Sequence, residues 1–363
     1  MELYKINFIL TLLIITIGLV IGMCLLLLSP PKAKHVKNYQ DARIVMAISY
    51  FMLGLFMIGQ ILVMPSIKTD KHIAWIIVIA LGAIQALSFT YSLISLINPE
   101  SFTKQKLRSE IIYICVFCIL NFVSYFILPY YISIILFTLF SGYYIFILIR
   151  YTHLFYNVFK EYKYQMDNYF SEQEWKRLKW ISFTFYYALL IGIFAFLSLF
   201  SIDKGFVIFK AFIIPFYIYC GCHFVNYGFK FQRDKYAEVI SGEELASCSG
   251  ITPASFNELE SLIDQWIKQK NYLRTGITIE QAAAELTTNR TYLSNYINTF
   301  KQQTFREWIN HLRISEAKQL LLKKTELTAS EIGKMVGFSD RSNFTRQFIK
   351  VTGMSPMSWK NKQ

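Results

Sequence analysis

Charged residues are scarce in this chain of 363 residues: Asp, Glu, Lys and Arg together make up only 17% of it. An average soluble domain carries about a quarter. The shortage is concentrated before residue 228, where long apolar runs dominate, and this composition predicts membrane-spanning helices there. Acidic residues are the scarcer kind, 24 against 37 basic ones, which gives a formal net charge of +13. Such an excess is typical of proteins that bind nucleic acid or anionic lipid.

Cysteine is also rare, and five of the six cysteines lie inside apolar runs. This placement argues against a secreted disulfide framework. The spacings Cys115-x-x-Cys118 and Cys220-Gly-Cys222-His223 are compatible with a metal or haem site, but thiols in apolar helices commonly pack as small hydrophobic groups. We favour packing and predict neither a metal nor a cofactor. The apolar runs also lack an HExxH pair and a carboxylate cluster, so we predict no enzyme.

Seven apolar runs reach or approach the length of about 20 residues that spans a bilayer. They cover residues 6–28, 42–64, 73–97, 111–128, 130–150, 180–200 and 205–227. The first run is longer than the apolar core of a signal peptide, and no cleavage motif follows it, so we expect it to be retained. Pro129 separates the fourth and fifth runs, which predicts a tight hairpin. Residues 1–228 are therefore expected to form a seven-helix transmembrane bundle.

The loops between these spans differ in positive charge. If the C-terminus faces the cytoplasm, the predicted loops 29–41, 98–110 and 151–179 share that side, and thirteen Lys and Arg residues lie in or beside them. Only four lysines lie on the opposite side. Because positive charge is enriched on the cytoplasmic side of membrane proteins, we predict an N-terminus outside and a C-terminus in the cytoplasm.

Few polar groups interrupt the spans, and Lys210 is the most prominent. An ionised side chain inside a bilayer often marks a ligand or ion path. A lysine near the end of a span can instead extend its ammonium group to the membrane surface. We favour surface extension, and keep Lys210 as a candidate contact for an unidentified signal ligand.

Hydrophobicity falls after residue 227, and residues 229–251, which have mixed charge, are expected to form a juxtamembrane linker. In residues 252–363 one pattern then occurs twice: a capping box, a short helix, a turn and a second helix. The two boxes are Thr278–Gln281 and Thr328–Glu331. The repetition predicts two helix-turn-helix motifs.

The second helix of each motif has an apolar stripe at spacings of four and three residues. The stripes are Leu293, Ile297 and Phe300 in the first motif, and Phe344, Phe348 and Val351 in the second. Such a stripe faces the core and leaves the polar residues of the helix outside. Gly337 is expected to supply the left-handed residue of the second turn.

A helix from about Thr304 to Lys323 joins the two motifs and would be about 30 Å long. Since one turn of B-DNA advances about 34 Å, motifs held that far apart can enter successive major grooves. Residues 251–363 contain sixteen Lys and Arg against ten Asp and Glu, a net charge of +6. One helical hairpin with a polar outer face is a common packing element, but two in tandem favour DNA binding.

A set of residues across the linking helix and the second motif carries a family signature. The matching positions are Arg313, Ile314, Ala317, Leu320, Leu321, Ile332, Val336, Gly337, Phe338, Ser339, Asp340, Ser342, Phe344, Arg346, Phe348, Gly353, Ser355 and Pro356. With Tyr292-Leu293-Ser294 in the first motif, they resemble the AraC/XylS transcription regulators over about residues 252–362. The resemblance implies an all-α domain that binds double-stranded promoter DNA, usually within a dimeric regulator, with RNA polymerase as a further partner.

The resemblance also implies, position by position, which residues face DNA. They are Arg290, Thr291, Ser294 and Asn295 in the first motif, and Arg341, Ser342, Asn343 and Arg346 in the second. Four positions depart from the family pattern, and one of them is Asn295, which replaces a frequent basic residue. Thr287 stands where the first turn often has glycine, Gln302 where glycine often ends the first recognition helix, and Gly333 where the second motif often has alanine.

The sequence thus predicts an all-α protein of the bacterial cytoplasmic membrane that acts as a one-component transcription regulator, with a signal-sensing membrane part. One alternative is that the membrane part is a passive anchor and proteolysis frees the DNA-binding part. Another is a transporter or membrane enzyme with a regulatory DNA-binding tail. Against the latter, the spans lack paired intramembrane charges, and no inverted repeat is evident.

Overall fold

The computed structural model describes residues 2–27, 37–63, 71–172, 179–198, 204–231, 256–323 and 326–363. In these residues every regular element is a helix, and the only β-type pairing is an isolated bridge between Phe170 and Thr278. The predicted all-α class is confirmed, while most of the predicted linker 229–251 lies outside the described residues. The chain forms two compact units: residues 1–160 with 178–243, called here the apolar unit, and residues 161–177 with 244–363, the C-terminal unit.

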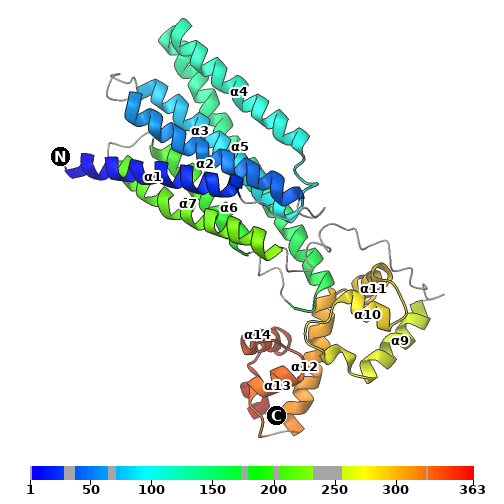
Figure 1. The fold of residues 1–363 in the computed structure, drawn as a ribbon. Helices are drawn as coiled ribbons and strands as arrows, with labels where there is room; N and C mark the ends of the chain where they lie inside the picture. Colours follow the sequence, from blue (N-terminus) through cyan, green and yellow to red (C-terminus); the bar gives the residue numbers. More distant parts are fainter. Residues whose placement is uncertain are drawn as a thin grey trace. The chain divides into compact units, whose positions relative to one another are not determined.

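The apolar unit contains the seven predicted spans as helices (Figure 1). They are α1 (Glu2–Leu27), α2 (Lys37–Val63), α3 (Lys71–Ile97), α4 (Lys104–Ile127), α5 (Tyr130–Tyr169), α6 (Lys179–Ser198) and α7 (Lys204–Phe231). All seven are long and apolar enough to cross a membrane. Large apolar side chains on their outer faces, such as Ile119 and Phe126 of α4, are exposed, as lipid contact requires. Pro129 separates α4 from α5, so the predicted hairpin is confirmed.

Helix α5 departs from the prediction, because it continues far beyond residue 150. The loop predicted at 151–179 is wrong for residues 151–169, which complete a helix of 40 residues. The reason is visible in the sequence: Tyr151, Phe155, Val158, Tyr162, Met166 and Tyr169 follow helical spacing, and all six are buried. Lys160, Glu161 and Lys163, which lie between them, are exposed on the other face. The last turns of α5 belong to the C-terminal unit.

Close helix approach holds α1, α2 and α7 together. A Cβ atom at Gly18 of α1 would lie 2.8 Å from the carbonyl oxygen of Tyr50 and 3.1 Å from Cα of Gly54, both in α2. Small residues at such a crossing let two backbones touch, which is a main source of helix association in lipid. The hydroxyl of Tyr50 then donates to the carbonyl of Tyr217 in α7, at 2.6 Å.

Two ionisable groups of the apolar unit have partners that sequence reasoning did not supply. Glu110 is buried and pairs with Arg150, but both residues lie at the ends of the predicted spans 111–128 and 130–150 rather than inside them. Lys210 is only 7% exposed, and its ammonium group bonds to side chains of α1. It therefore does not extend to the surface as expected.

The C-terminal unit consists of short helices around one long helix, α12. Its elements are α9 (Phe256–Lys268), η4 (Asn271–Leu273), α10 (Ile279–Glu285), α11 (Arg290–Tyr296), η5 (Ile297–Lys301), α12 (Phe305–Lys323), α13 (Ala329–Met335), α14 (Arg341–Thr352) and α15 (Pro356–Lys362). Figure 1 shows α12 running between the pair α10 and α11 and the pair α13 and α14. The predicted long linking helix is thus confirmed, with 19 residues.

Arg313 of α12 is fully buried and joins the two halves of this unit. Its guanidinium donates to the carbonyl oxygens of Tyr272, at 2.9 Å, and Arg274, at 2.6 Å. It also lies over the ring of Phe338, 5.6 Å from the ring centre. Burial lowers the pKa of the Arg313 guanidinium to about 10, despite the opposing effect of Glu172. Since Tyr272 precedes the first motif and Phe338 lies in the turn of the second, Arg313 fixes both against α12.

Candidate nucleic-acid interface

Each helix-turn-helix motif starts with the predicted capping box. Thr278 accepts a hydrogen bond from the backbone N–H of Gln281, whose side chain accepts from the backbone of Thr278. Thr328 and Glu331 repeat the arrangement at the start of α13. These reciprocal bonds satisfy N–H groups that a helix start leaves open, so both first helices begin where the sequence predicts.

The two turns use the same left-handed backbone conformation with different residues. Gly337 has φ +90° and Thr287, fifty positions earlier, has φ +51°. Threonine is branched at Cβ and disfavours this region, whereas glycine enters it without strain. The first turn therefore keeps the usual geometry although it departs from the family pattern at Thr287. Gln302, with φ +50°, does the same at the end of the first recognition helix.

Gly333 makes room for a bulky partner. A Cβ atom at this position would come within 2.9 Å of the ring of Phe344. The corresponding residues of the first motif are Ala283 and the smaller Leu293, both buried. The second motif thus combines the larger Phe344 with the smaller Gly333, where the first motif combines Leu293 with Ala283. Packing against Phe344 therefore explains why glycine replaces alanine at position 333.

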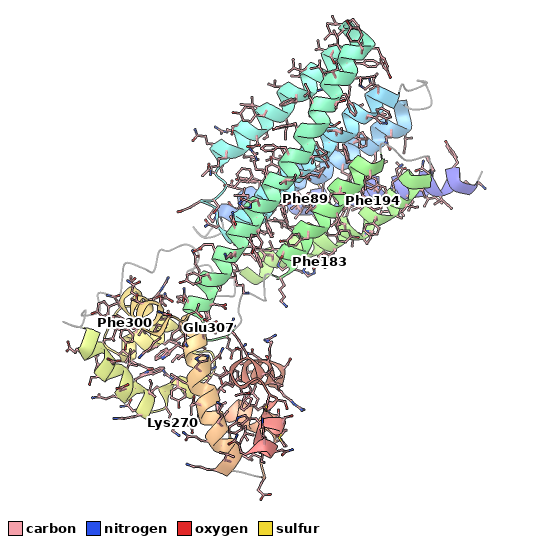
Figure 2. All side chains as sticks on the ribbon, turned by 180° about the vertical axis from the view of Figure 1, so that it is seen from behind. Phe89, Phe183, Phe194, Lys270, Phe300 and Glu307 are labelled. Atoms are coloured by element: carbon pink, nitrogen blue, oxygen red, sulfur yellow. The ribbon has the colours of Figure 1, made fainter. Side chains whose placement is uncertain are left out.

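The apolar stripes place α11 and α14 against the core, with one error. Leu293, Ile297, Phe344 and Phe348 are buried as predicted. Phe300, labelled in Figure 2, is instead 55% exposed. The cause is the π-helical turn Ile297–Lys301 at the end of α11, because a wider turn shifts the phase of the residues that follow it.

The first motif presents its predicted DNA-facing residues on α11. Thr291 and Asn295 are exposed, and Ser294 is half-buried and accepts a hydrogen bond from Asn298 at 3.2 Å. Arg290, at the first position of the helix, is half-buried and lies 3.9 Å from a carboxylate oxygen of Glu280. The free polar groups of this face are hydroxyl and amide groups, which suit base edges and phosphates.

The second motif has the more basic face. Arg341, Ser342 and Arg346 are exposed, and with Thr345 and Ile349 they line a shallow depression on α14. Two guanidinium groups beside hydroxyls on one exposed helix face can bind guanine edges and phosphate oxygens. The structure thus brings three of the four residues predicted for this motif onto one surface.

Asn343 is the exception among the eight predicted residues. It is only 6% exposed, and its Oδ1 accepts a hydrogen bond from Nη2 of Arg346 at 3.0 Å. Its backbone N–H is capped by the carboxylate of Asp340, at 2.6 Å. The geometry fits a residue that positions Arg346 better than one that reads a base itself.

Sequence reasoning missed a further element of this unit, the segment 161–172 at the end of α5, called here the docking segment. Its strongest contact is an ion pair between Asp167 and Arg306 of α12, at 2.5 Å. The two side chains are 15% and 8% exposed, so the pair is largely shielded from water. The backbone N–H of Ser171 also donates to the carbonyl of Ile277, at 3.2 Å.

The docking segment touches both motifs. The hydroxyl of Tyr169 donates to Glu280 of the first motif, and the guanidinium of Arg290 lies over the Tyr169 ring, 5.1 Å from its centre. Ser339, in the second turn, donates to Glu172 at 2.8 Å. One predicted DNA-facing residue, Arg290, is therefore also part of an intramolecular contact. The helical spacing of the apolar residues in 151–169 was the only signal that could have revealed this segment.

Comparison with known proteins agrees with this geometry. Residues 282–362 match a family model described as a helix-turn-helix domain. These residues contain most of the first motif, α12 and the second motif. The C-terminal unit accordingly contains a helix-turn-helix domain.

The curated relatives are transcription regulators as well. The chain is 30% identical over 109 residues to the HTH-type transcriptional activator RhaR of Enterobacter sp. (strain 638), covering 30% of this chain and 38% of that protein. It is 32% identical over 121 residues to the uncharacterized HTH-type transcriptional regulator YobQ of Bacillus subtilis (29% and 48%), and 39% identical over 70 residues to the arabinose operon regulatory protein of Escherichia coli (18% and 24%). The chain thus spans less than half the length of each of these relatives. No solved structure matches it significantly.

Proposed function

We propose that this protein is a membrane-bound one-component transcription regulator of the AraC/XylS family. Its apolar unit senses a signal in the bacterial cytoplasmic membrane, and its C-terminal unit binds promoter DNA in the cytoplasm. The excess of basic residues in the loops on one side supports an outer N-terminus and a cytoplasmic C-terminus. A homodimer and a contact with RNA polymerase follow from the family resemblance and belong to the same proposal.

For DNA binding, α11 and α14 enter successive major grooves. Helix α12, with 19 residues, is about 28 Å long, close to the advance of one DNA turn of about 34 Å. The exposed arginines of α14 supply guanine and phosphate contacts, and Thr291, Ser294 and Asn295 of α11 supply hydrogen bonds. Arg290 adds a phosphate contact once its intramolecular partners release it.

The observation that carries the sensing part of the proposal is the docking segment. Helix α5 is one helix from Tyr130 to Tyr169, and its last turns are part of the C-terminal unit. A passive anchor has no need of a membrane helix that contacts both DNA-binding motifs. A span that ends on those motifs supplies a physical route for a signal.

The simplest way for a signal to pass from α5 to the DNA-binding motifs is competition between the docking segment and DNA for Arg290. While the segment is docked, Tyr169 and Glu280 hold the guanidinium of Arg290. DNA phosphate and the docking segment then compete for the same charge. A shift of α5 that withdraws Tyr169 favours the DNA-bound state by the free energy of the contacts it breaks.

Crosslinking and immunoprecipitation of the full-length protein in its membrane, followed by sequencing of the bound DNA, tests the proposed function. We expect enrichment at a few promoters that contain two elements about 10 base pairs apart. Clear sites for a fragment 251–363 without sites for the intact protein would favour release by proteolysis. Enrichment with neither protein would refute the function.

The variant Arg346→Ala tests whether α14 reads bases in promoter DNA. Loss of one bidentate base contact costs about 1–3 kcal/mol, so promoter affinity should fall about 5- to 150-fold while membrane insertion is unchanged. Lys323→Ala, which removes an exposed cation at the end of α12, serves as the control and should retain affinity within a small factor. Equal effects of both variants would show that α14 contributes only general charge.

A further inference from the structure

A cavity of about 100 Å³ lies inside the apolar unit, among α2, α3, α5, α6 and α7. Its wall is mainly aliphatic and aromatic and includes Leu53, Phe185, Ile213 and Phe89, which is labelled in Figure 2. A dry apolar cavity of about 150 Å³ accepts benzene, so this smaller one suits a ligand with an apolar body of a few carbon atoms and is too small for a two-chain lipid. Apolar pockets with a few polar groups are the usual form of a small-molecule site.

The polar side chains in the wall of the cavity differ in how many hydrogen bonds they make within the protein. Gln85 already makes three hydrogen bonds, because its amide N–H donates to the carbonyl of Ser49 at 2.9 Å and its Oε1 accepts from the hydroxyls of Tyr217 and Ser49. Gln60 lines the cavity without a hydrogen-bond partner among the described residues. A ligand therefore finds an available amide at Gln60 and a rigid polar network at Gln85.

Lys210 supplies the decisive charge. Its ammonium group donates to Oδ1 of Asn7 at 2.9 Å and to Oγ1 of Thr11 at 2.8 Å, both uncharged. The Thr11 hydroxyl donates in turn to the backbone carbonyl of Asn7, at 2.7 Å, so it accepts from Lys210. An ammonium group has three donors, which leaves one unused, and within the described residues no carboxylate pairs with it.

We infer that the cavity binds a small amphipathic anion, a carboxylic acid with a compact apolar body, whose carboxylate pairs with Lys210. A buried cation with neutral partners in a low-dielectric wall lacks a counter-charge, and an anionic ligand supplies it. The apolar body fills the space lined by α2, α3 and α6, and Gln60 offers a second hydrogen bond. This inference rests on the proposed sensing function, since it names the chemical class of the signal.

Propionate is a suitable probe for a cavity of this size, with 1-propanol and propylamine as its uncharged and cationic counterparts. Full-length protein in phosphatidylcholine nanodiscs is titrated with radiolabelled propionate in a scintillation proximity assay, and empty nanodiscs give the background. We expect saturable binding of propionate and little competition from the other two compounds. Lys210→Met should weaken binding about 10- to 150-fold, the value of a hydrogen bond to a charged group.

Two further variants keep the test decisive. Lys104→Met removes a lysine of the same unit that pairs with Asp41 outside the cavity, and should leave propionate binding unchanged. Ala188→Phe fills the cavity while Lys210 remains, and should abolish binding even if Lys210→Met fails to fold. Equal binding of 1-propanol, no saturable binding, or full displacement by phosphatidylglycerol in the nanodisc would each overturn the inference.

Promoter binding by the same samples separates the two proposals. Sequence-specific DNA binding without propionate binding would refute the ligand class and leave the regulator function standing. Propionate binding that depends on Lys210, without any specific DNA binding, would refute the regulator function and favour a role confined to the apolar unit.

Discussion

Asp167→Ala tests whether the docking segment is held by its ion pair. The substitution leaves the Arg306 guanidinium largely buried without its carboxylate, and Nε of Arg306 already has no hydrogen-bond partner. Breaking a buried pair by removing one partner costs about 3–5 kcal/mol. Because Asp167 is 15% exposed, we expect the lower end, about 3 kcal/mol, which corresponds to about a 150-fold change in the docking equilibrium.

Hydrogen exchange of the full-length protein in nanodiscs measures this equilibrium directly. The amide of Ser171, which donates to Ile277, is protected only while the segment is docked. Its exchange rate should rise about 100-fold in Asp167→Ala. Glu161→Ala, on the exposed face of the same helix, is the matched control, since within the described part of the chain Glu161 bonds only to Gln165.

A double-mutant cycle with Arg306→Met isolates the pair. The double variant should be less destabilised than the sum of the single ones, because no unpaired charge then remains. An unchanged Ser171 exchange rate in Asp167→Ala, or an equal rise in Glu161→Ala, would refute the claim that the ion pair holds the segment.

Three other substitutions test the C-terminal unit, with urea unfolding followed by pulse proteolysis as the common assay. Thr287→Gly should raise the free energy of unfolding by about 1 kcal/mol, because glycine relieves the left-handed strain; no gain would contradict that strain. Gly337→Ala should lower it by at least about 2 kcal/mol, since its Cβ would lie 2.2 Å from the carbonyl oxygen of Leu273 at φ +90°. Burial opposes ionisation of Glu307, but bonds from Lys350 and Thr304 outweigh it and lower its pKa. The stability this group contributes is therefore present above its ordinary pKa and lost as pH falls through the lowered value, and Glu307→Gln should remove that acid-dependent loss.

Local signals in the sequence were sufficient for most of the fold. The seven spans, both capping boxes, the left-handed Gly337 and the buried pairs Leu293–Ile297 and Phe344–Phe348 all follow from composition or helical spacing over a few residues. Each of these features is decided by interactions within one or two turns of helix. That is the range over which sequence patterns are informative.

The features that the sequence predicted wrongly, or not at all, have causes beyond one or two turns of helix. Phe300 is exposed because a π-helical turn alters the phase of its helix, which the regular spacing of the stripe conceals. Residues 151–169 of α5 were predicted to be a loop because their charges masked a helical apolar stripe. The contacts of the docking segment join residues more than 100 positions apart, such as Tyr169 with Glu280. No local sequence pattern predicts contacts over this distance. Asn343 fits the family pattern by position, but packing turns it inward.

The C-terminal unit is assembled from two separate stretches of chain, 161–177 and 244–363, and this arrangement restricts how it can be released from the rest of the protein. A single proteolytic cut between α7 and α9 severs only one of the two attachments. The fragment after the cut stays bound to the end of α5 through Arg306, Glu280 and Ser339 until those contacts also open. Liberation of the DNA-binding motifs therefore requires two events, one covalent and one conformational. A protease acting on the undisturbed protein would yield a nicked chain whose helix-turn-helix motifs are still held by α5.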